Sequence, residues 1–337
     1  MSDCNTRVLY KSAPNGLPST DNFEISQEAI PEPGPGEFLL QNLYLSLDPY
    51  MRMLMGGGWT YSPNTLAPGD LMVGRVIGRV VKTLNPEYPE GTMVVGRLGW
   101  QTHVVSNGEN LDFIVENTDR IQLSAYLGVC GSTGTTAWIG LKQAGRPKPG
   151  ETVLVSAAAG SVGSTVGQLA KAWDCKAIGI AGGPQKCKMV VEEFGFDACV
   201  DYKAEDLKGQ IALAAPEGVD VYFDNVGGVV LEAALANMNR LGRIPVCGVL
   251  SAYNETSERY GIKNMHLFFD KSLSMEGFVL SAHKDLWLQA RVEIENLILN
   301  DQLVYKETIS EGIESAPSAF IGMLKGKNIG KQLVKFT

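Results

Sequence analysis

The sequence has too few suitably spaced metal ligands to form a common metal site. It contains no Cys-x-x-Cys pair, and its three histidines, at positions 103, 266 and 283, lie far apart. A structural zinc ion needs clustered thiolates, and a catalytic one usually needs three protein ligands. The sequence therefore predicts no metal site, and His103 is interpreted as a polar residue of a strand. An enzyme built on this chain would polarise its substrate with other groups.

Long apolar runs and an excess of basic residues are also lacking. No run approaches the length of a membrane span, and residues 1–6 lack the basic, apolar character of a signal sequence. The net charge of −8 over 337 residues argues against nucleic acid or an anionic membrane as a partner. The six cysteines are scattered, several of them in apolar stretches, which predicts reduced thiols in a cytoplasmic protein.

The most informative segment present joins an apolar strand to a helix through a turn of small residues. It gives the pattern Ala157-x-x-Gly160-x-x-Gly163, with alanine at the usual first glycine position. Small residues let the backbone approach a phosphate, and a helix start offers unpaired N–H groups and the positive end of its dipole. The segment predicts a site for the pyrophosphate of a dinucleotide, formed by Ala159, Gly160, Ser161, Val162 and Gly163.

The surroundings of this turn fit a strand–helix–strand unit. Apolar residues recur at helical spacing after Gly160, at Val162, Val166, Leu169 and Trp173. Residues 175–181 then form a second apolar run, typical of a buried strand. This order predicts a βαβ unit with a right-handed crossover.

The end of the second strand decides the expected cofactor. An NAD site usually has an Asp or Glu there, which binds the ribose 2′-hydroxyl. Residues 180–186 read Ile-Ala-Gly-Gly-Pro-Gln-Lys and contain no carboxylate. Lys186 can instead supply a cation for a 2′-phosphate, so we expect NADPH/NADP⁺ rather than NADH. The alternative interpretation of Lys186 is a solvated lysine in the first turn of a helix.

The chain divides into two regions of different pattern. Apolar strand candidates at 37–47, 73–81 and 91–100, separated by Pro- and Gly-rich turns, predict a mostly antiparallel, barrel-like β domain. From about residue 128 strands and helices alternate, which predicts an α/β domain with a doubly wound parallel sheet. We expect residues 1–127 and 300–337 to form the first domain and residues 128–299 the second.

The second region supplies enough elements for a six-stranded sheet. After the two strands above, further strands are expected at 198–202, 219–227, 242–250 and 273–280, with Pro245 awkward inside a central strand. Helices are expected at 135–144 and from Pro184, the latter with a buried stripe of Cys187, Val190, Val191 and Phe194. The last segment, from about residue 303, is expected to give a strand, a helix at 316–324 and a final run at 330–336.

Several stretches together resemble a known family. They are residues 44–52 (Tyr-Leu-Ser-Leu-Asp-Pro-Tyr-Met-Arg), 157–163, 181–187, 223–228, 246–254 and 326–331. The chain resembles the medium-chain dehydrogenases/reductases, and more narrowly their zinc-independent branch of NADPH-dependent 2-alkenal, prostaglandin (leukotriene B4 12-hydroxydehydrogenase-like) and curcumin reductases. The resemblance implies a Rossmann domain, a GroES-like β-barrel domain and a homodimer. One departure is Gly131-Ser-Thr-Gly134, where the family usually has Gly-Met-Pro-Gly.

The resemblance also implies roles for individual residues. Lys186 and Tyr202 match residues at the adenosine 2′-phosphate, and Tyr50 and Tyr253 match tyrosines around the substrate carbonyl. The other implied cofactor contacts are Gly182, Asn225, Cys247, Gly248, Tyr253, Phe278, Val279 and Asn328. Each has a structural alternative: Asn225 and Asn328 suit turns, Tyr50 suits packing at a strand end, and Tyr253 suits a surface loop.

These observations predict the reduction of a carbon–carbon double bond conjugated to a carbonyl. Hydride reaching the β-carbon places negative charge on the carbonyl oxygen, and hydroxyl donors stabilise that charge. We expect Tyr253 and a ribose hydroxyl to be the donors, with Tyr50 assisting, and small apolar enals or enones as substrates. The alternatives are a zinc-free quinone reductase and a non-catalytic NADPH-binding protein. Trp59 and Tyr61, in a Gly-rich loop, are interpreted as a lid over the substrate or as a hairpin tip.

Overall fold

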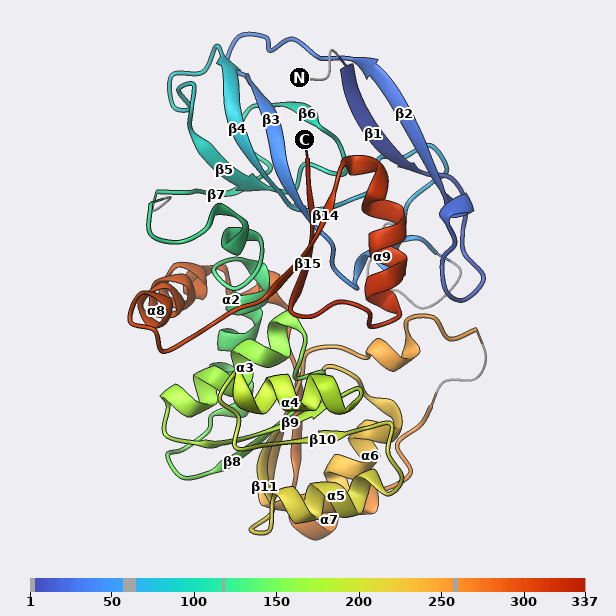
Figure 1. Cartoon of the computed structure of the whole chain (residues 1–337), viewed down its shortest axis with the longest axis vertical. Coiled ribbons are helices and arrows are strands. Elements are labelled where there is room, and N and C mark those ends of the chain that lie inside the picture. The colour runs from blue at the N-terminus through green and yellow to red at the C-terminus, as the bar shows by residue number, and fades with distance from the viewer. Residues whose placement is uncertain (1–3, 57–64, 117–118, 257–259, 337) are drawn as a thin grey trace. The chain divides into compact units, whose positions relative to one another are not determined.

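The computed structural model describes residues 4–56, 65–116, 119–256 and 260–336, which form two compact units (Figure 1). The first unit contains residues 1–128 and 307–337, and the second contains residues 129–306. Trp59 and Tyr61, interpreted above as part of a lid, lie outside the described residues.

The first unit is built on a mostly antiparallel sheet of seven strands. Its hydrogen-bonded order is β14-β15-β3-β4-β5-β7, with β6 paired to β3, and only β14 and β15 are parallel. A separate antiparallel pair joins β1 to β2. The mostly antiparallel domain expected from the sequence is confirmed. The bounds are β1 Cys4–Tyr10, β2 Phe23–Ala29, β3 Phe38–Ser46, α1 Met51–Leu54, β4 Val76–Thr83, β5 Met93–Gly96, β6 His103–Ser106, β7 Leu111–Ile114, β14 Glu307–Glu311, α9 Ala316–Leu324 and β15 Lys331–Lys335.

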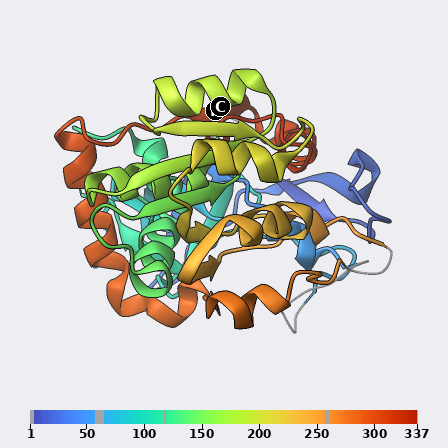
Figure 2. The same cartoon turned by 90° about the horizontal axis from the view of Figure 1, so that it is seen from below.

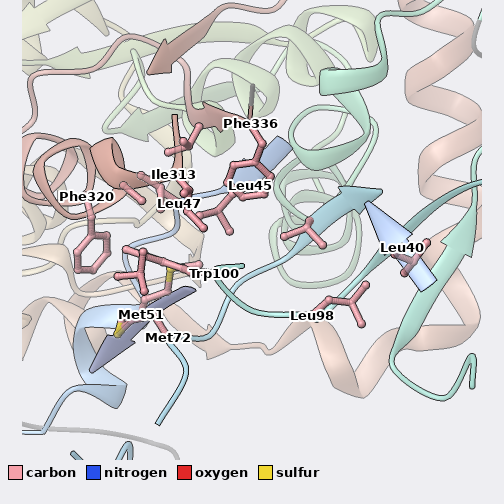
Figure 3. Packing of buried hydrophobic residues seen from close by; sticks show 14 of the residues in the cluster. Leu40, Leu45, Leu47, Met51, Met72, Leu98, Trp100, Ile313, Phe320 and Phe336 are labelled. Atoms are coloured by element: carbon pink, nitrogen blue, oxygen red, sulfur yellow. The ribbon is translucent and has the colours of Figure 1, made fainter. Parts of the chain in front are cut away.

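The core of this unit is centred on the indole of Trp100. Its ring stacks on Phe23 at a centroid distance of 5.9 Å and meets the edge of Phe320 at 5.8 Å. Met51 and Met72 lie beside it (Figure 3), and all five side chains belong to one buried cluster. His103 is a buried residue of β6, as expected, and burial lowers its pKa.

The second unit is the doubly wound sheet that the sequence predicts. Its strand order is β10-β9-β8-β11-β12-β13, all parallel, which is the order of a dinucleotide-binding domain. Helices cover both faces of the sheet (Figures 1 and 2). The bounds are α2 Ser132–Ile139, β8 Thr152–Ser156, α3 Ser161–Ala172, β9 Lys176–Ala181, α4 Pro184–Glu192, β10 Ala198–Asp201, α5 Leu207–Ala214, β11 Val219–Phe223, α6 Gly228–Asn237, β12 Met238–Val246, α7 His266–Lys271, β13 Ser274–Gly277 and α8 Trp287–Leu299.

Side chains alternate between the two faces of this sheet. Leu154, Ile178 and Tyr222 belong to one buried cluster with residues of α5 and α6, among them Ile211 and Leu235. On the opposite face α3 and α4 pack against β8, β9 and β10. Because both of their faces are covered, the central strands β8 and β11 are buried along nearly their whole length.

Some sequence-based boundaries were wrong. The helix expected at 135–144 begins at Ser132 and changes at Gly140 into a π-helical turn, Gly140–Gly145. A Cβ at Gly140 would lie 2.2 Å from the ring of Phe278, so this ring packs directly on the helix backbone.

The last strands of the parallel sheet also differ from the expected ranges. β12 begins at Met238 and ends at Val246. Pro245 lies near the end of this strand, and its carbonyl accepts a hydrogen bond from the amide of Asp224. β11 ends at Phe223 and β13 at Gly277, both earlier than expected. The residues that follow these strands are therefore loops rather than strand.

The buried stripe that the sequence analysis predicted for α4 was partly wrong. Val190 and Phe194 are buried, but Val191 is 37% exposed and Cys187 is only partly buried, while Met189 is buried instead. Helix α4 has only nine residues, and its buried face is centred on Met189 and Val190.

Candidate cofactor and substrate site

The turn after β8 has the backbone of a phosphate-binding loop. Ala157 stands in the left-handed region with φ of 51°, the conformation that glycine would take at this first fingerprint position. The amide of Gly160 donates to the carbonyl of Ala157 at 2.9 Å, which closes the turn. A Cβ at Gly163 would lie only 2.3 Å from the same carbonyl oxygen, so glycine is required there.

Helix α3 begins directly at this turn. Gly160 is its N-cap and provides no side-chain cap, so the N–H groups of Ser161, Val162 and Gly163 start the helix without one. The hydroxyl of Thr133, from the segment that departs from the family pattern, forms a 2.6 Å hydrogen bond with the hydroxyl of Ser161. The departure thus contacts the predicted pyrophosphate site itself.

Two lysines lie together beyond the end of β9. Burial and the nearby ammonium of Lys203 lower the pKa of Lys186, so the two cations repel each other. Lys203 also lies over the ring of Tyr202, 6.0 Å from its centroid, and a Cβ at Gly182 would meet that ring at 2.8 Å. Gly182, Lys186 and Tyr202 are therefore brought together, and Lys203 joins them. An anion placed here would relieve the repulsion.

Asn225 is fixed by the end of the neighbouring strand. Its amide N–H donates to the hydroxyl of Ser156 at 2.8 Å, and its side-chain Nδ2 donates to the carbonyl of Ser156 at 2.7 Å. Oδ1 of Asp224 accepts hydrogen bonds from the hydroxyl of Tyr222 and from the amides of Val226 and Gly227. These bonds hold the loop after β11 against the end of β8.

The same carboxylate residue also organises the loop after β12. The backbone carbonyl of Asp224 accepts the amides of Cys247, at 2.8 Å, and Gly248, at 3.2 Å. Burial, with a smaller effect of the Asp224 charge, raises the pKa of Cys247 to about 12, so its thiol stays protonated. Burial likewise raises the pKa of Asp224, against the effect of the hydrogen bonds that it accepts.

Tyr253 lies at the same edge of the sheet. A Cβ at Gly248 would be 3.2 Å from the hydroxyl of Tyr253 and 3.4 Å from the carbonyl oxygen of Asn225. Gly248, Asn225 and Tyr253 are thus neighbours at the carboxyl ends of β11 and β12, where ligands of such sheets bind. A side chain at position 248 would crowd this hydroxyl.

Phe278 and Val279 follow β13. The ring of Phe278 packs on Gly140 and lies edge-on to Phe223 at 6.1 Å between centroids. This side chain is part of the packing between β11, β13 and the π-helical turn, whereas the side chain of Val279 is 54% exposed.

Two of the expected site residues, Tyr50 and Asn328, belong to the first unit. Tyr50 precedes α1, packs on the core cluster and interacts electrostatically with Arg75. Asn328 lies between α9 and β15, and its Nδ2 donates to the carbonyl of Gly330 at 2.9 Å. Lys331, three residues later, forms a buried ion pair with Asp48, two residues before Tyr50.

Three contributors were missed by the sequence interpretation, namely Ser156, Asp224 and Lys203. Ser156 and Asp224 are polar residues inside otherwise apolar runs, a signal that was available. The sequence signal for Lys203 was weaker, namely a cation shortly after β10, the third strand of the parallel sheet along the chain. Among the described residues no group of three His, Cys, Asp or Glu side chains is arranged to hold a metal ion, and no helix is both long and apolar enough to cross a membrane.

Comparison with known proteins identifies the family. A profile described as the N-terminal domain of oxidoreductase matches residues 6–114, and one described as zinc-binding dehydrogenase matches residues 161–293. An NADPH-dependent curcumin reductase from Escherichia coli K12 is 41% identical, over 98% of this chain and 96% of its own length. The chain belongs to the medium-chain dehydrogenase/reductase family of curcumin, prostaglandin and 2-alkenal reductases.

Other members of this family are similar to this protein over nearly the whole length of the chain. Prostaglandin reductase 1 from Bos taurus is 41% identical over 95% of both chains, and an NADP⁺-dependent 2-alkenal reductase from Nicotiana tabacum is 37% identical over 98% and 97%. The solved structure of CurA from Vibrio vulnificus in complex with NADPH is 38% identical, covers 98% of this chain and 99% of its own, and has a TM-score of 0.93. The family resemblance expected from the sequence is confirmed.

Proposed function

We propose that this protein is an NADPH-dependent reductase of carbon–carbon double bonds conjugated to a carbonyl group. The observation that carries the proposal is the lysine pair Lys186 and Lys203 near the end of β9, where residues 180–186 themselves contain no carboxylate. Names of the relatives, which include curcumin, prostaglandin and 2-alkenal reductases, support the same reaction class.

The described residues fit the proposed cofactor. The N-terminal turn of α3, which has no side-chain cap, and the close approach allowed at Gly163 suit a pyrophosphate. The two cations suit a 2′-phosphate, which forms strong charge-assisted hydrogen bonds. Asn225, Cys247 and Gly248 would contact the ribose and nicotinamide. When bound, the cofactor supplies a hydride.

Tyr253 is proposed to stabilise the charge that develops on the substrate. As the β-carbon gains a hydride, the electrons of the double bond move towards the carbonyl and the oxygen becomes an enolate oxygen. The Tyr253 hydroxyl donates a hydrogen bond to this oxygen, an interaction that strengthens in the transition state. The α-carbon then takes a proton from Tyr253 or from water, and the product is the saturated carbonyl compound. By their match to the family pattern, Tyr50 is proposed to act near the substrate carbonyl and Asn328 near the cofactor.

An assay with pure protein tests this function. NADPH oxidation is followed with a simple enal, a simple enone and a quinone, and the products are identified by mass spectrometry. We expect faster oxidation with the enal or enone, with formation of the saturated product. Faster turnover of the quinone would favour the quinone reductase, and NADPH binding without any turnover would favour a non-catalytic protein.

We also propose a cytoplasmic homodimer. Cys175, Cys187, Cys199 and Cys247 are free thiols, which suits a reducing compartment. In the part of the chain that the structure describes, β13 is the last strand of the parallel sheet and all four of its residues are exposed. Exposed edge strands invite pairing with another chain, and a second copy would cover this edge. Light scattering after size-exclusion chromatography tests it: a dimer is expected, with Met275→Lys shifting it towards monomer, and a monomeric native chain would contradict it.

A further inference from the structure

Two hydroxyl groups from different helices meet at the dinucleotide-binding turn. Thr133 belongs to the first turn of α2 and Ser161 is the first residue of α3, and their hydroxyl oxygens are 2.6 Å apart. Helices α2 and α3 pack against each other, so this hydrogen bond joins two elements of the second unit. Both residues are partly exposed, and the pair is therefore not sealed inside the domain.

Neighbouring threonines direct their hydroxyls differently. The hydroxyl of Thr136 donates to the carbonyl of Ser132 at 2.7 Å, and that of Thr165 donates to the carbonyl of Ser161 at 2.9 Å. Each of these bonds lies within one helix, a common arrangement for threonine in helices. The hydroxyl of Thr133 is bonded instead to a side chain of another helix, so it does not serve the backbone of its own helix in this way.

The backbone on both sides of this pair is closely packed. A Cβ at Gly134, the residue after Thr133, would overlap the backbone carbonyl of Val129, so the first turn of α2 packs directly on the backbone that precedes it. On α3, Gly163 makes the equally close contact with the turn that is described above. Thr133 and Ser161 therefore stand on a preorganised backbone, which lowers the entropic cost of binding a ligand there.

A pair of this kind can donate one hydrogen bond to an anion. Each hydroxyl has one proton, so the bond between them uses one proton and leaves the other. When Thr133 donates to Ser161, the Ser161 proton is the one left, and the first hydrogen bond polarises the second. Helical side chains lean towards the N-terminus, which brings this proton to the side of the uncapped amides of α3. Neither helix has an acidic residue in its first turn, which favours an anion there.

We propose that the hydroxyl of Ser161 binds the pyrophosphate of the cofactor and that Thr133 is a positioning residue that orients this hydroxyl. Thr133 donates its proton to the oxygen of Ser161, and Ser161 donates its own proton to a phosphate oxygen. The inference rests on the proposed function through its cofactor, and it gives a role to Thr133 in the segment 131–134 that departs from the family pattern.

The pair should act on the two nicotinamide cofactors alike. NADPH and NADH share the pyrophosphate and differ in the 2′-phosphate, so a contact with the pyrophosphate contributes equally to the binding of both. This separates the role of Ser161 from that of Lys186, whose loss is expected to weaken the binding of NADPH alone. The ratio of the two affinities therefore reports which phosphate a residue serves.

Fluorescence titration of single variants with NADPH and NADH tests the two roles. Ser161→Ala removes the proposed donor to a charged group and should weaken the binding of both cofactors about ten-fold. Thr133→Val keeps the shape of the side chain without its hydroxyl and should weaken both about three-fold, whereas Thr133→Ser keeps the hydroxyl and should bind nearly as the native protein does. Thr136→Val, which removes a hydroxyl bonded within α2, is the matched control and should leave both affinities unchanged.

The double variant tests whether Thr133 acts through Ser161. In the Ser161→Ala background, Thr133→Val should cause no further loss of affinity, because the hydroxyl that Thr133 orients is gone. A further three-fold loss would overturn the positioning role. Native affinity of Ser161→Ala, or a loss confined to NADPH, would overturn the assignment to the pyrophosphate.

The inference and the proposed function fail in different ways. A native protein that does not bind NADPH would refute the proposed function and this inference with it. A native protein that binds NADPH as tightly as Ser161→Ala and Thr133→Val do would refute this inference alone.

Discussion

The ammonium group of Lys331 donates a 2.5 Å hydrogen bond to Oδ1 of Asp48, and both side chains are buried in the first unit. The same ammonium donates to the carbonyl of Leu47 at 2.9 Å, and the hydroxyl of Ser46 donates to Oδ2 of Asp48. The pair joins β15 to the segment after β3. It therefore fixes the two stretches of the first unit that carry Asn328 and Tyr50.

Removal of the cation from this pair should destabilise the fold strongly. Lys331→Met leaves the Asp48 carboxylate buried without its main partner, which typically costs about 3–5 kcal/mol. The free energy of unfolding, obtained from a urea titration, measures this loss of stability. As a control, Lys176→Met breaks the exposed pair with Glu217 and should leave stability nearly unchanged. Equal effects of the two substitutions would contradict the role assigned to the buried pair.

The effect of Lys331→Met should also depend on pH. Burial disfavours the charged form of Asp48, but Lys331, Ser46 and Arg75 outweigh this and hold its pKa below the ordinary 3.8. A lowered pKa contributes stability above the unfolded pKa and loses it as the pH falls through the folded one. Without Lys331 burial dominates and the pKa rises. The variant's deficit should thus be largest at pH 7 and shrink towards about pH 4, and a constant deficit would count against this explanation.

The choice of cofactor should depend on Lys186. Replacement by alanine removes one cation from the proposed 2′-phosphate site, which should weaken NADPH binding about ten- to hundred-fold and leave NADH binding nearly unchanged. Fluorescence titration with both cofactors measures the ratio of their affinities. Lys188→Ala, two residues later on the exposed side of α4, is the matched control. Equal losses for both cofactors would refute the assignment.

The local pattern made some parts predictable and left others open. The turn after β8 was predictable because its backbone demands small residues over a few positions, and Ala157 takes the left-handed conformation of the usual glycine. The contact between Ser156 and Asn225 was not, because 69 residues separate the partners and only the strand order brings them together. The exposure of Val191 was missed for a similar reason, since the angle at which α4 crosses the sheet is set by tertiary packing.

The turn itself can be tested by two glycine substitutions three residues apart. In Gly163→Ala the new Cβ lies 2.3 Å from a backbone oxygen that cannot move freely, so a loss of about 1–3 kcal/mol is expected. In Gly160→Ala the contact with the same oxygen is 3.2 Å and φ is −87°, which alanine adopts readily. Thermal unfolding should place Gly160→Ala close to the native protein and Gly163→Ala well below it. The reverse order would mean that the turn has another conformation.

The hydroxyl of Tyr253 should matter for turnover and not for cofactor binding. Tyr253→Phe keeps the ring and removes the donor proposed for the enolate oxygen, which typically lowers kcat about 10²- to 10³-fold. Stopped-flow measurement of NADPH oxidation with an enone gives kcat, and a fluorescence titration gives the NADPH affinity, which should stay within about two-fold of the native value. Tyr260→Phe, at an exposed position seven residues later, controls for the loss of a hydroxyl as such. A drop in kcat confined to Tyr253→Phe supports the donor role, because a structural defect would weaken NADPH binding as well. An unchanged kcat would contradict the role assigned to Tyr253.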